Sequence, residues 1–135
     1  MQKEIKVKTK KRLELVDISA EVNEAVKNSK AENGACIIFT PHATAAIIIN
    51  ENYDQNICDD FLIALKNLIP QGKWRHDEVD GNADAHIKAA ICGPSEAIPI
   101  KEGKLQLGRW QSPMLAEFDG PRERTIIISM IEDKR

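Results

Sequence analysis

Alternation of apolar and polar residues opens the chain. Ile5 and Val7 alternate with polar neighbours over residues 2–9, and a second apolar pair follows at Leu13 and Leu15. Strict alternation is typical of a half-buried strand, and the basic residues between the two pairs suit a turn. We therefore expect a β-hairpin at the N-terminal end.

Helical spacing begins next. Val22 and Val26 recur on one side of a helix of about three turns, and Ser19 precedes them as the expected N-cap. The Asn33-Gly34 pair supplies a residue that tolerates the left-handed conformation, so we expect it to end this helix.

Two β-branched, apolar runs follow at 35–40 and 44–50, separated by a short turn that contains His42. Such runs are typical of buried central strands, which puts His42 at a strand edge. A second helix is expected to begin at Asp54 and to bury the apolar positions that recur at helical spacing from Ile57 until a Pro-Gln-Gly sequence stops it.

The second half of the chain predicts a polar surface loop and then mostly strands. Residues 72–84 lack periodic apolar positions, and Asp84 is a candidate cap for a short helix that ends at Cys92. Strands are expected around 97–100, 104–110 and 125–131, with a possible fourth at 114–118. The fold class is therefore α+β, with mixed, mostly antiparallel sheets and two to three helices in a single domain over residues 1–135.

Composition narrows the function classes. The chain has 135 residues, of which 42% are hydrophobic and 30% charged, so we expect a single domain. Its net charge of −2 provides no overall positive field, so we expect no nucleic-acid partner. The charged N-terminus and the short apolar runs predict no signal peptide and no membrane span. Three widely spaced cysteines argue against a disulfide framework or a thiolate zinc site, which indicates a cytoplasmic protein.

Candidate chemistry centres on three histidines, His42, His76 and His86, each at an expected loop or helix start. Carboxylates and amides near them are the N and O donors that suit zinc or another divalent ion, although an acidic loop is as well explained by a solvated surface. Arg109, Arg122 and Arg124 could form a phosphate clamp, or could simply be solvated or pair with neighbouring carboxylates.

Several of these residues fall into ordered motifs. They are Thr40-Pro41-His42-Ala43-Thr44-Ala45-Ala46, Asn50-Glu51-Asn52, Asp60, His76-Asp77, Asn82-Ala83-Asp84-Ala85-His86-Ile87-Lys88, Gly108-Arg109-Trp110-Gln111 and the segment 117–124. In these motifs, over about residues 3–131, the chain resembles the YjbQ-like family, catalogued as secondary thiamine-phosphate synthase enzymes. Arg109 departs from the small residue that is usual in the family, and Pro41 precedes the histidine where other residues are common.

The resemblance implies a YjbQ-like fold and a homotrimer with polar clefts near subunit boundaries. It also implies an activity that joins a hydroxymethylpyrimidine pyrophosphate to a thiazole phosphate and releases pyrophosphate, in a site that contains zinc or magnesium. The alternatives are a metal-dependent hydrolase of a small phosphorylated metabolite and a non-catalytic trimer that binds a metal or ligand. The implied residues are, for catalysis, His42, Glu51, Asp60 and His86; for substrate binding, Asn52, Asn82, Lys88, Trp110, Gln111, Arg122 and Arg124; and for the metal, His76, His86 and His42.

Overall fold

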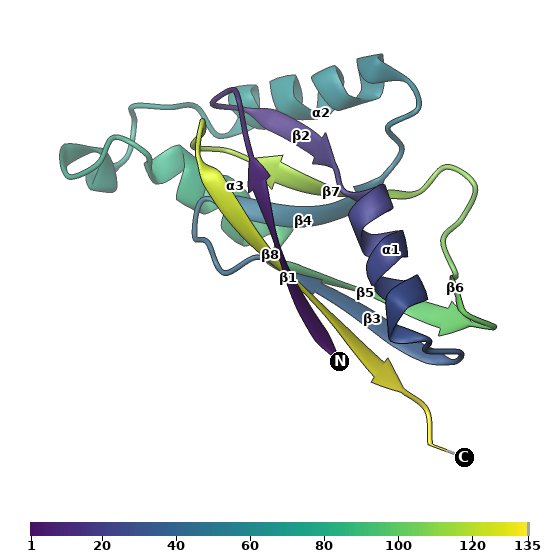
Figure 1. Cartoon of the computed structure of the whole chain (residues 1–135). Helices are drawn as coiled ribbons and strands as arrows, with labels where there is room; N and C mark the ends of the chain where they lie inside the picture. The colour runs from purple at the N-terminus through teal and green to yellow at the C-terminus, as the bar shows by residue number, and fades with distance from the viewer. Residues whose placement is uncertain (135) are drawn as a thin grey trace.

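Two antiparallel β-sheets and three α-helices make up the part of the chain that the computed structural model describes, residues 1–134 (Figure 1). The strands are β1 (Gln2–Lys8), β2 (Glu14–Asp17), β3 (Gly34–Phe39), β4 (Ala45–Asn50), β5 (Ser95–Lys101), β6 (Lys104–Leu105), β7 (Ser112–Glu117) and β8 (Glu123–Glu132). The helices are α1 (Ser19–Ser29), α2 (Gln55–Leu68) and α3 (Ala83–Cys92), with a short 3₁₀ helix η1 (Arg75–Glu78). The predicted α+β class is confirmed.

The strands divide into a five-stranded sheet of order β1-β8-β3-β5-β6 and a three-stranded sheet of order β2-β7-β4. Alternate residues of each strand point to the same face of its sheet, so each sheet has one face that can be buried. The main core lies between these buried faces and α1. Val22 of α1, Ile47 of β4 and Ile128 of β8 are all fully buried there.

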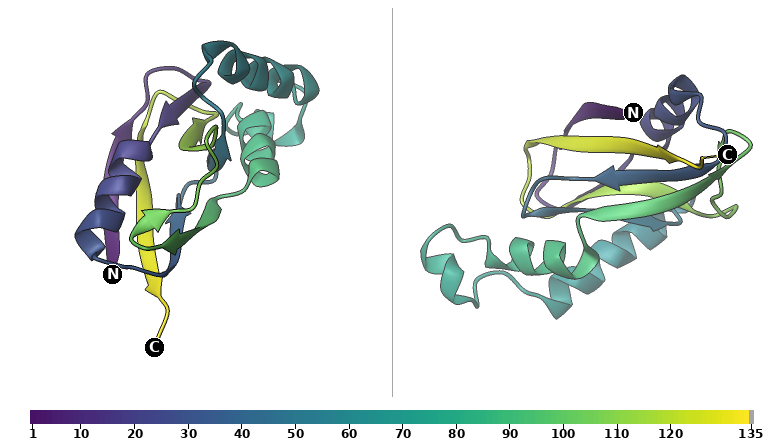
Figure 2. Two further views of the ribbon diagram at one scale, coloured as in Figure 1. Left: turned by 90° about the vertical axis from the view of Figure 1, so that its right-hand side faces the viewer. Right: turned by 90° about the horizontal axis from the view of Figure 1, so that it is seen from below.

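A second, smaller core lies on the other face of the three-stranded sheet. Ala46 of β4 and Ala116 of β7 are small enough to let α3 approach through Ala85 and Ala89, and Phe118 fills the remaining space. Seen from below, α2 and α3 lie on the side of the sheets opposite to β1 and α1 (Figure 2). The three-stranded sheet is therefore covered on both faces.

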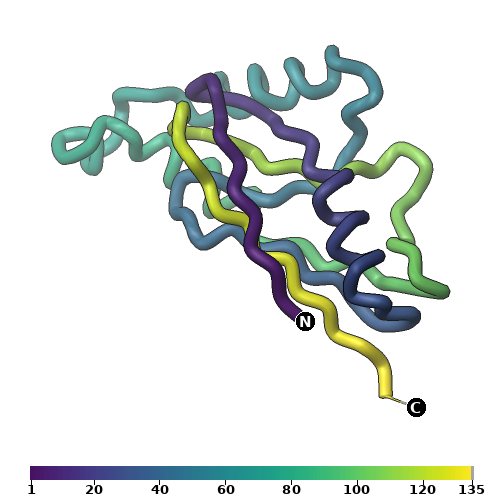
Figure 3. The backbone as a smooth tube through the Cα atoms, viewed as in Figure 1, coloured from purple at the N-terminus to yellow at the C-terminus, as the bar shows by residue number. Residues whose placement is uncertain are grey.

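The predicted N-terminal hairpin is wrong. β1 pairs with β8, with Gln2 opposite Ser129, whereas β2 pairs with β7, with Glu14 opposite Glu117. The backbone trace shows the chain turning between the two strands and leaving one sheet for the other (Figure 3). Alternation sets which face of a strand is buried but not which strand it pairs with, and the ten-residue β8 offers β1 a partner over its whole length.

Helix α1 begins and ends differently from the prediction. Its N-cap is Ile18, and the Ser19 backbone N–H donates to Asp17 Oδ1 at 2.7 Å. Lys30, with φ of 59°, takes the left-handed position at its C-terminal end. Gly34 instead begins β3 with φ of 147°, where an added Cβ would lie 2.0 Å from the Ile131 carbonyl oxygen.

Asp54 caps α2 as predicted, accepting from the Asn56 backbone N–H at 2.9 Å. The expected burial of its apolar face is wrong for the single chain: Cys58 is the buried residue of this helix, while Ile57 is 40% and Leu68 74% exposed. α2 contributes mainly half-buried side chains to the second core, so much of its apolar surface faces outward.

Three further expectations need correction. Asp84 does not cap α3, because the helix begins at Ala83 and the Asp84 side chain is fully buried. The Ala83 backbone N–H donates to Asp77 Oδ1 instead. β4 is buried but stands at an edge of its sheet rather than at the centre. The strand expected at 104–110 covers Lys104–Leu105 alone, whereas the possible fourth strand is present as β7. No helix among the described residues is long and apolar enough to span a membrane.

Candidate functional site

An open hollow of about 580 Å³ lies where the turn after β3, the start of α3 and the β7–β8 connection meet. Five of the predicted site residues line it. They are His42, Asn82, His86, Arg122 and Arg124. Segments about 40 residues apart in the sequence are thus brought together, because β4 and β7 pair while α3 packs on β4.

His42 is held by a backbone hydrogen bond. The Thr125 N–H donates to His42 Nε2 at 2.9 Å, so the lone pair of that nitrogen is occupied and the proton of the neutral ring is on Nδ1. Burial, together with the nearby Arg124 guanidinium, lowers the pKa of His42 below its usual value. In this arrangement His42 offers an N–H donor and has no free lone pair for a metal ion.

His76 and His86 lie close to each other, with ring centroids 5.0 Å apart in an edge-to-face arrangement. His76 Nε2 also lies 3.5 Å from Asp80 Oδ2, and its side chain is 42% exposed. Within residues 1–134, however, no three His, Cys, Asp or Glu side chains are grouped closely enough to hold a metal ion. The predicted set of three metal-binding histidines is therefore not assembled within one chain.

Asn82 has an unsatisfied acceptor. Its Nδ2 donates to Asp119 Oδ2 at 2.8 Å, while its buried Oδ1 has no hydrogen-bond partner among the described residues. Buried polar atoms are normally paired, so this oxygen is suited to accept from a ligand N–H or O–H in the hollow. Burial raises the pKa of Asp119, but hydrogen bonds from Asn82 and Arg122 outweigh burial and lower it, which keeps the carboxylate charged.

The two arginines differ in exposure. Arg122 has a side chain 53% exposed, which donates through Nε to the Asp119 carbonyl oxygen at 2.8 Å and through Nη2 to the Asp119 carboxylate at 3.0 Å. Arg124 is only 3% exposed. The expectation of two accessible arginines is therefore corrected: Arg124 lies within β8 on the face that points into the protein, while Arg122 precedes the strand.

A buried ion pair fixes Arg124. Its Nε donates to Glu117 Oε1 at 2.8 Å, its Nη2 donates to Glu117 Oε2, and Nη2 also donates to Thr44 Oγ1 at 2.8 Å. Glu117, itself fully buried, further accepts from Thr9 Oγ1 at 2.8 Å. The network ties β7, β8 and the β3–β4 turn together beneath the hollow.

The β7–β8 turn leaves no room for a side chain at Gly120. An added Cβ there would lie 2.2 Å from the Lys11 carbonyl oxygen and 2.8 Å from Thr9 Oγ1. Because the Gly120 N–H also donates to the Arg12 carbonyl oxygen at 3.1 Å, the turn is pressed against the β1–β2 connection. This contact positions Asp119 and Arg122 at the rim of the hollow.

A second group of predicted site residues lies elsewhere on the chain. Glu51 and Asp60 line a mostly apolar cavity of about 250 Å³ between α2 and the three-stranded sheet. Asn52 Nδ2 donates to Asp17 Oδ2 at 2.8 Å. The cavity and the hollow around His42 have no lining residue in common.

Trp110 and Gln111 belong to the turn before β7. The Trp110 ring is 51% exposed and lies edge-on to Tyr53, with centroids 5.8 Å apart. Arg109 stacks over the same ring at 5.0 Å, and Gln111 Oε1 accepts from the Gly108 N–H at 2.8 Å. These contacts form a surface cluster that does not line the hollow.

Lys88 lies on a different face of α3 from His86. It is 1% exposed, and its Nζ lies 2.8 Å from Asp84 Oδ2. It lines another cavity and does not join Arg122 as a cation of the hollow.

Two residues important to the hollow were not assigned a role from the sequence, although both stand in the quoted motifs. Nothing in the type or position of Thr44 points to its contact with Arg124. Glu117 does carry one, because it is a carboxylate inside the otherwise apolar run 113–118, and a buried charge requires a partner such as Arg124.

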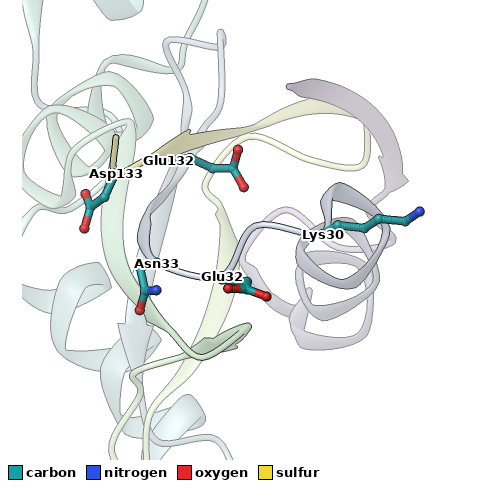
Figure 4. A pocket seen from close by; sticks show the side chains of 5 residues that line it. All are labelled: Lys30, Glu32, Asn33, Glu132 and Asp133. Carbon is teal, nitrogen blue, oxygen red and sulfur yellow. The ribbon is translucent and has the colours of Figure 1, made fainter. Parts of the chain in front are cut away.

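Another hollow, also of about 580 Å³, lies at the far end of the sheets near the end of β8 (Figure 4). The carboxylates of Glu132 and Asp133 point in opposite directions there, and Lys30 extends away from both (Figure 4). Because these side chains do not converge, this hollow is a weaker candidate for a functional site.

Comparison with known proteins shows similarity over nearly the whole chain. Residues 3–133 match the family model described as "UPF0047 protein YjbQ-like". A UPF0047 protein of Methanocaldococcus jannaschii is 46% identical over 128 residues, which cover 95% of this chain and 92% of that protein. The UPF0047 protein YugU of Bacillus subtilis is 39% identical over 134 residues, covering 97% of this chain and 99% of YugU.

Solved structures agree with this similarity. The crystal structure of a YbjQ-like protein of unknown function from Sulfolobus solfataricus superposes with a TM-score of 0.95 at 39% identity, covering 98% of this chain and 97% of that chain. A hypothetical protein from Aeropyrum pernix gives a TM-score of 0.94 at 36% identity, covering 98% and 99%.

Proposed function

The chain belongs to the family of UPF0047, YjbQ-like proteins, and we propose that the hollow around His42 and His86 is the active site of an enzyme with secondary thiamine-phosphate synthase activity. In this reaction the thiazole nitrogen of the thiazole phosphate forms a bond to the methylene carbon of hydroxymethylpyrimidine pyrophosphate. The carbon–oxygen bond to the pyrophosphate breaks, and the pyrophosphate leaves with the electron pair. The substrates are small and phosphorylated, as the family resemblance implies.

The observation that carries the proposal is the convergence of polar groups in one open hollow. His42 presents an Nδ1–H donor, Arg122 presents an exposed guanidinium, and Asn82 presents an unsatisfied oxygen. Donors and cations stabilise the negative charge that develops on a leaving pyrophosphate. The Asn82 Oδ1 is suited to accept from the exocyclic amino group of the pyrimidine.

His86 lines the same hollow, and we assign it to donating a proton to an oxygen of the leaving pyrophosphate. His42 already uses its lone pair on the Thr125 N–H, so His86 would also be the base that accepts a proton from water if hydrolysis occurred. Arg124 acts indirectly in this account: with Glu117 and Thr44 it holds the floor of the hollow, and its buried charge adds to the positive potential there. No step of the proposed reaction depends on the zinc or magnesium ion that the family resemblance implies.

A homotrimer is the proposed assembly. Both faces of β3 are apolar: Ile38 is buried in the core, while Ile37 and Phe39 on the outer face are only half-buried. Ile131 of β8, which is 55% exposed, continues this outer face. An apolar sheet face of this kind is typical of a surface that a partner covers. The family resemblance supplies the number three, and it favours a cytoplasmic protein with no nucleic-acid or membrane partner.

A trimer also offers a role for the second group of predicted residues. Glu51 and Asp60 do not reach the hollow of their own chain. We propose that they lie near a subunit boundary and supply carboxylates to the hollow of a neighbouring subunit. If the implied metal ion is bound, His76 would hold it together with donors from the same source, because His86 is assigned to proton transfer.

Hydrolysis of a small phosphorylated metabolite is the second candidate function. The hollow is open to solvent, so water can reach a bound phosphate ester as readily as a second substrate can. In that reaction water takes the place of the thiazole nitrogen as the nucleophile.

One assay separates these candidates. Purified protein is incubated with both substrates and with the pyrimidine pyrophosphate alone, and thiamine phosphate and pyrophosphate are quantified by chromatography. The synthase proposal predicts thiamine phosphate and pyrophosphate in equal amounts, with a large loss in His86→Ala and Arg122→Ala but not in the control Arg109→Ala. Pyrophosphate release from the pyrimidine alone would favour hydrolysis, and binding without turnover would favour a non-catalytic protein.

A further inference from the structure

A second polar cavity, of about 520 Å³, lies across α3 from the hollow around His42. Asp84 and Lys88, one helical turn apart, share the face of α3 that lines it, while His86 between them lines the hollow. Arg12 of the β1–β2 connection and Lys66 near the end of α2 complete its charged lining. The two cavities share no lining residue.

The charges that line this cavity are unbalanced. Three are positive, Arg12, Lys66 and Lys88, and one is negative, Asp84, which leaves an excess of positive charge. Asn67 and Gln71 add side-chain amides, which can donate hydrogen bonds. A cavity with this lining attracts an anion and provides donors for its oxygens.

The buried pair beneath the cavity gives it a fixed geometry. Asp84 is fully buried and Lys88 is 1% exposed, with Lys88 Nζ 2.8 Å from Asp84 Oδ2. The other carboxylate oxygen of Asp84 lies 3.2 Å from Arg12 Nη2. Burying a carboxylate and an ammonium gives little net stability compared with apolar residues, so stability alone does not account for the pair.

What the pair does is hold Arg12 in place. The Arg12 side chain is 32% exposed, so its guanidinium is fixed on one side by Asp84 and remains accessible to the cavity on the other. Burial raises the pKa of Asp84, but hydrogen bonds from Lys88 and Arg12 outweigh burial and lower it, so the carboxylate stays charged while it holds them. A fixed guanidinium binds phosphate oxygens with less loss of freedom than a mobile one.

From this arrangement we propose that the cavity binds the phosphate group of a small ligand, with Arg12 and Lys66 as direct contacts and Lys88 as a buried supporting charge. This site is separate from the proposed active site and does not depend on the activity proposed for it. Inorganic phosphate is the simplest ligand that carries the recognised chemistry.

The test is calorimetric titration of inorganic phosphate into the full chain at constant ionic strength. Arg12→Gln and Lys66→Gln are each expected to weaken binding at this site by about tenfold or more, since a charge-assisted hydrogen bond is lost. Lys11→Gln is the matched control: it removes the same charge from an exposed neighbour of Arg12 that does not line the cavity, and should leave binding unchanged. Lys66 is exposed, so its replacement should not disturb folding.

Arg122→Gln distinguishes this proposal from the proposed active site. If Arg12→Gln and Lys66→Gln both bind phosphate with the affinity of the wild type, the second site is wrong. It is also wrong if Lys11→Gln weakens phosphate binding as much as they do. Loss of all phosphate binding in Arg122→Gln alone would overturn the second site and support the hollow around His42. Binding that survives Arg122→Gln and is lost in Arg12→Gln supports the second site whatever the outcome at the first.

Discussion

Replacing Arg124 by Ala removes one partner of a buried ion pair. Arg124 is 3% exposed and Glu117 is fully buried, and their side chains share two hydrogen bonds, with a third from Arg124 to Thr44. In the Arg124→Ala variant the Glu117 carboxylate keeps its hydrogen bonds from Thr9 and the Asp119 N–H but loses its neutralising charge. The protein must then bury an uncompensated charge or protonate it.

The expected cost is large. Breaking a buried ion pair by removing one partner typically costs about 3–5 kcal/mol of unfolding free energy. For a chain of this size, that corresponds to a fall of about 10–20 °C in the thermal midpoint. Arg122→Ala, which removes an exposed partner of Asp119, should cost only about 0–1 kcal/mol. The matched arginines therefore separate a structural role from a surface role.

The assay is urea unfolding followed by circular dichroism at one fixed protein concentration. The double variant Arg124→Met, Glu117→Gln removes both charges together, so it should recover much of the stability that Arg124→Ala loses. Equal stability losses in Arg124→Ala and Arg122→Ala would refute the buried pair. So would a double variant less stable than Arg124→Ala.

The pKa of His42 is lowered in the folded protein, so as the pH falls below about 6.5 the unfolded chain binds a proton at His42 more readily than the folded protein does. The free energy of unfolding therefore decreases as the pH falls. In His42→Gln, the free energy of unfolding measured with urea should change less between about pH 7.5 and 5.5. Gly120→Ala should destabilise the protein by about 1–3 kcal/mol, because the added Cβ would clash with backbone atoms. Gly108→Ala should cost less, because the Cβ there would contact only a side chain. Equal thermal midpoints of the two variants would contradict this expectation. Burial raises the pKa of Cys36 to about 11, so a thiol reagent at pH 8 should label it only after unfolding; rapid labelling of the native protein would contradict its burial.

The sequence was most informative where a residue acts on its neighbours along the chain. Asp54 caps α2 through a contact two residues away, and the apolar runs around His42 became β3 and β4 with His42 in the turn between them. Both outcomes follow from local backbone preference and apolar patterning. The α+β class followed from the same signals.

Partnerships between distant residues could not be predicted in this way. The alternation around Ile5 predicts a strand but does not select β8 as its partner. Asp84 has the composition of a helix cap, yet the approach of Arg12, which is 72 residues away, makes it a buried anion. Arg124 looks like a surface residue until the pairing of β7 and β4 brings Glu117 and Thr44 beside it.

The candidate site shows the same division. His42, His86 and Asn82 do converge, because α3 packs on β4. Glu51 and Asp60, which belong to the same ordered set of motifs, lie over a different cavity in the single chain. Sequence order contains no information on which motifs share a cavity.

The most direct test of the proposed active site is the imidazole ¹H–¹⁵N spectrum of the protein during titration with thiamine phosphate. We expect His42 to carry its proton on Nδ1 in the free protein and the signals of His42 and His86 to shift on titration, with the shifts greatly reduced in Arg122→Ala. Signals of both histidines that remain unchanged while thiamine phosphate binds would contradict it, because the ligand would then occupy another part of the protein.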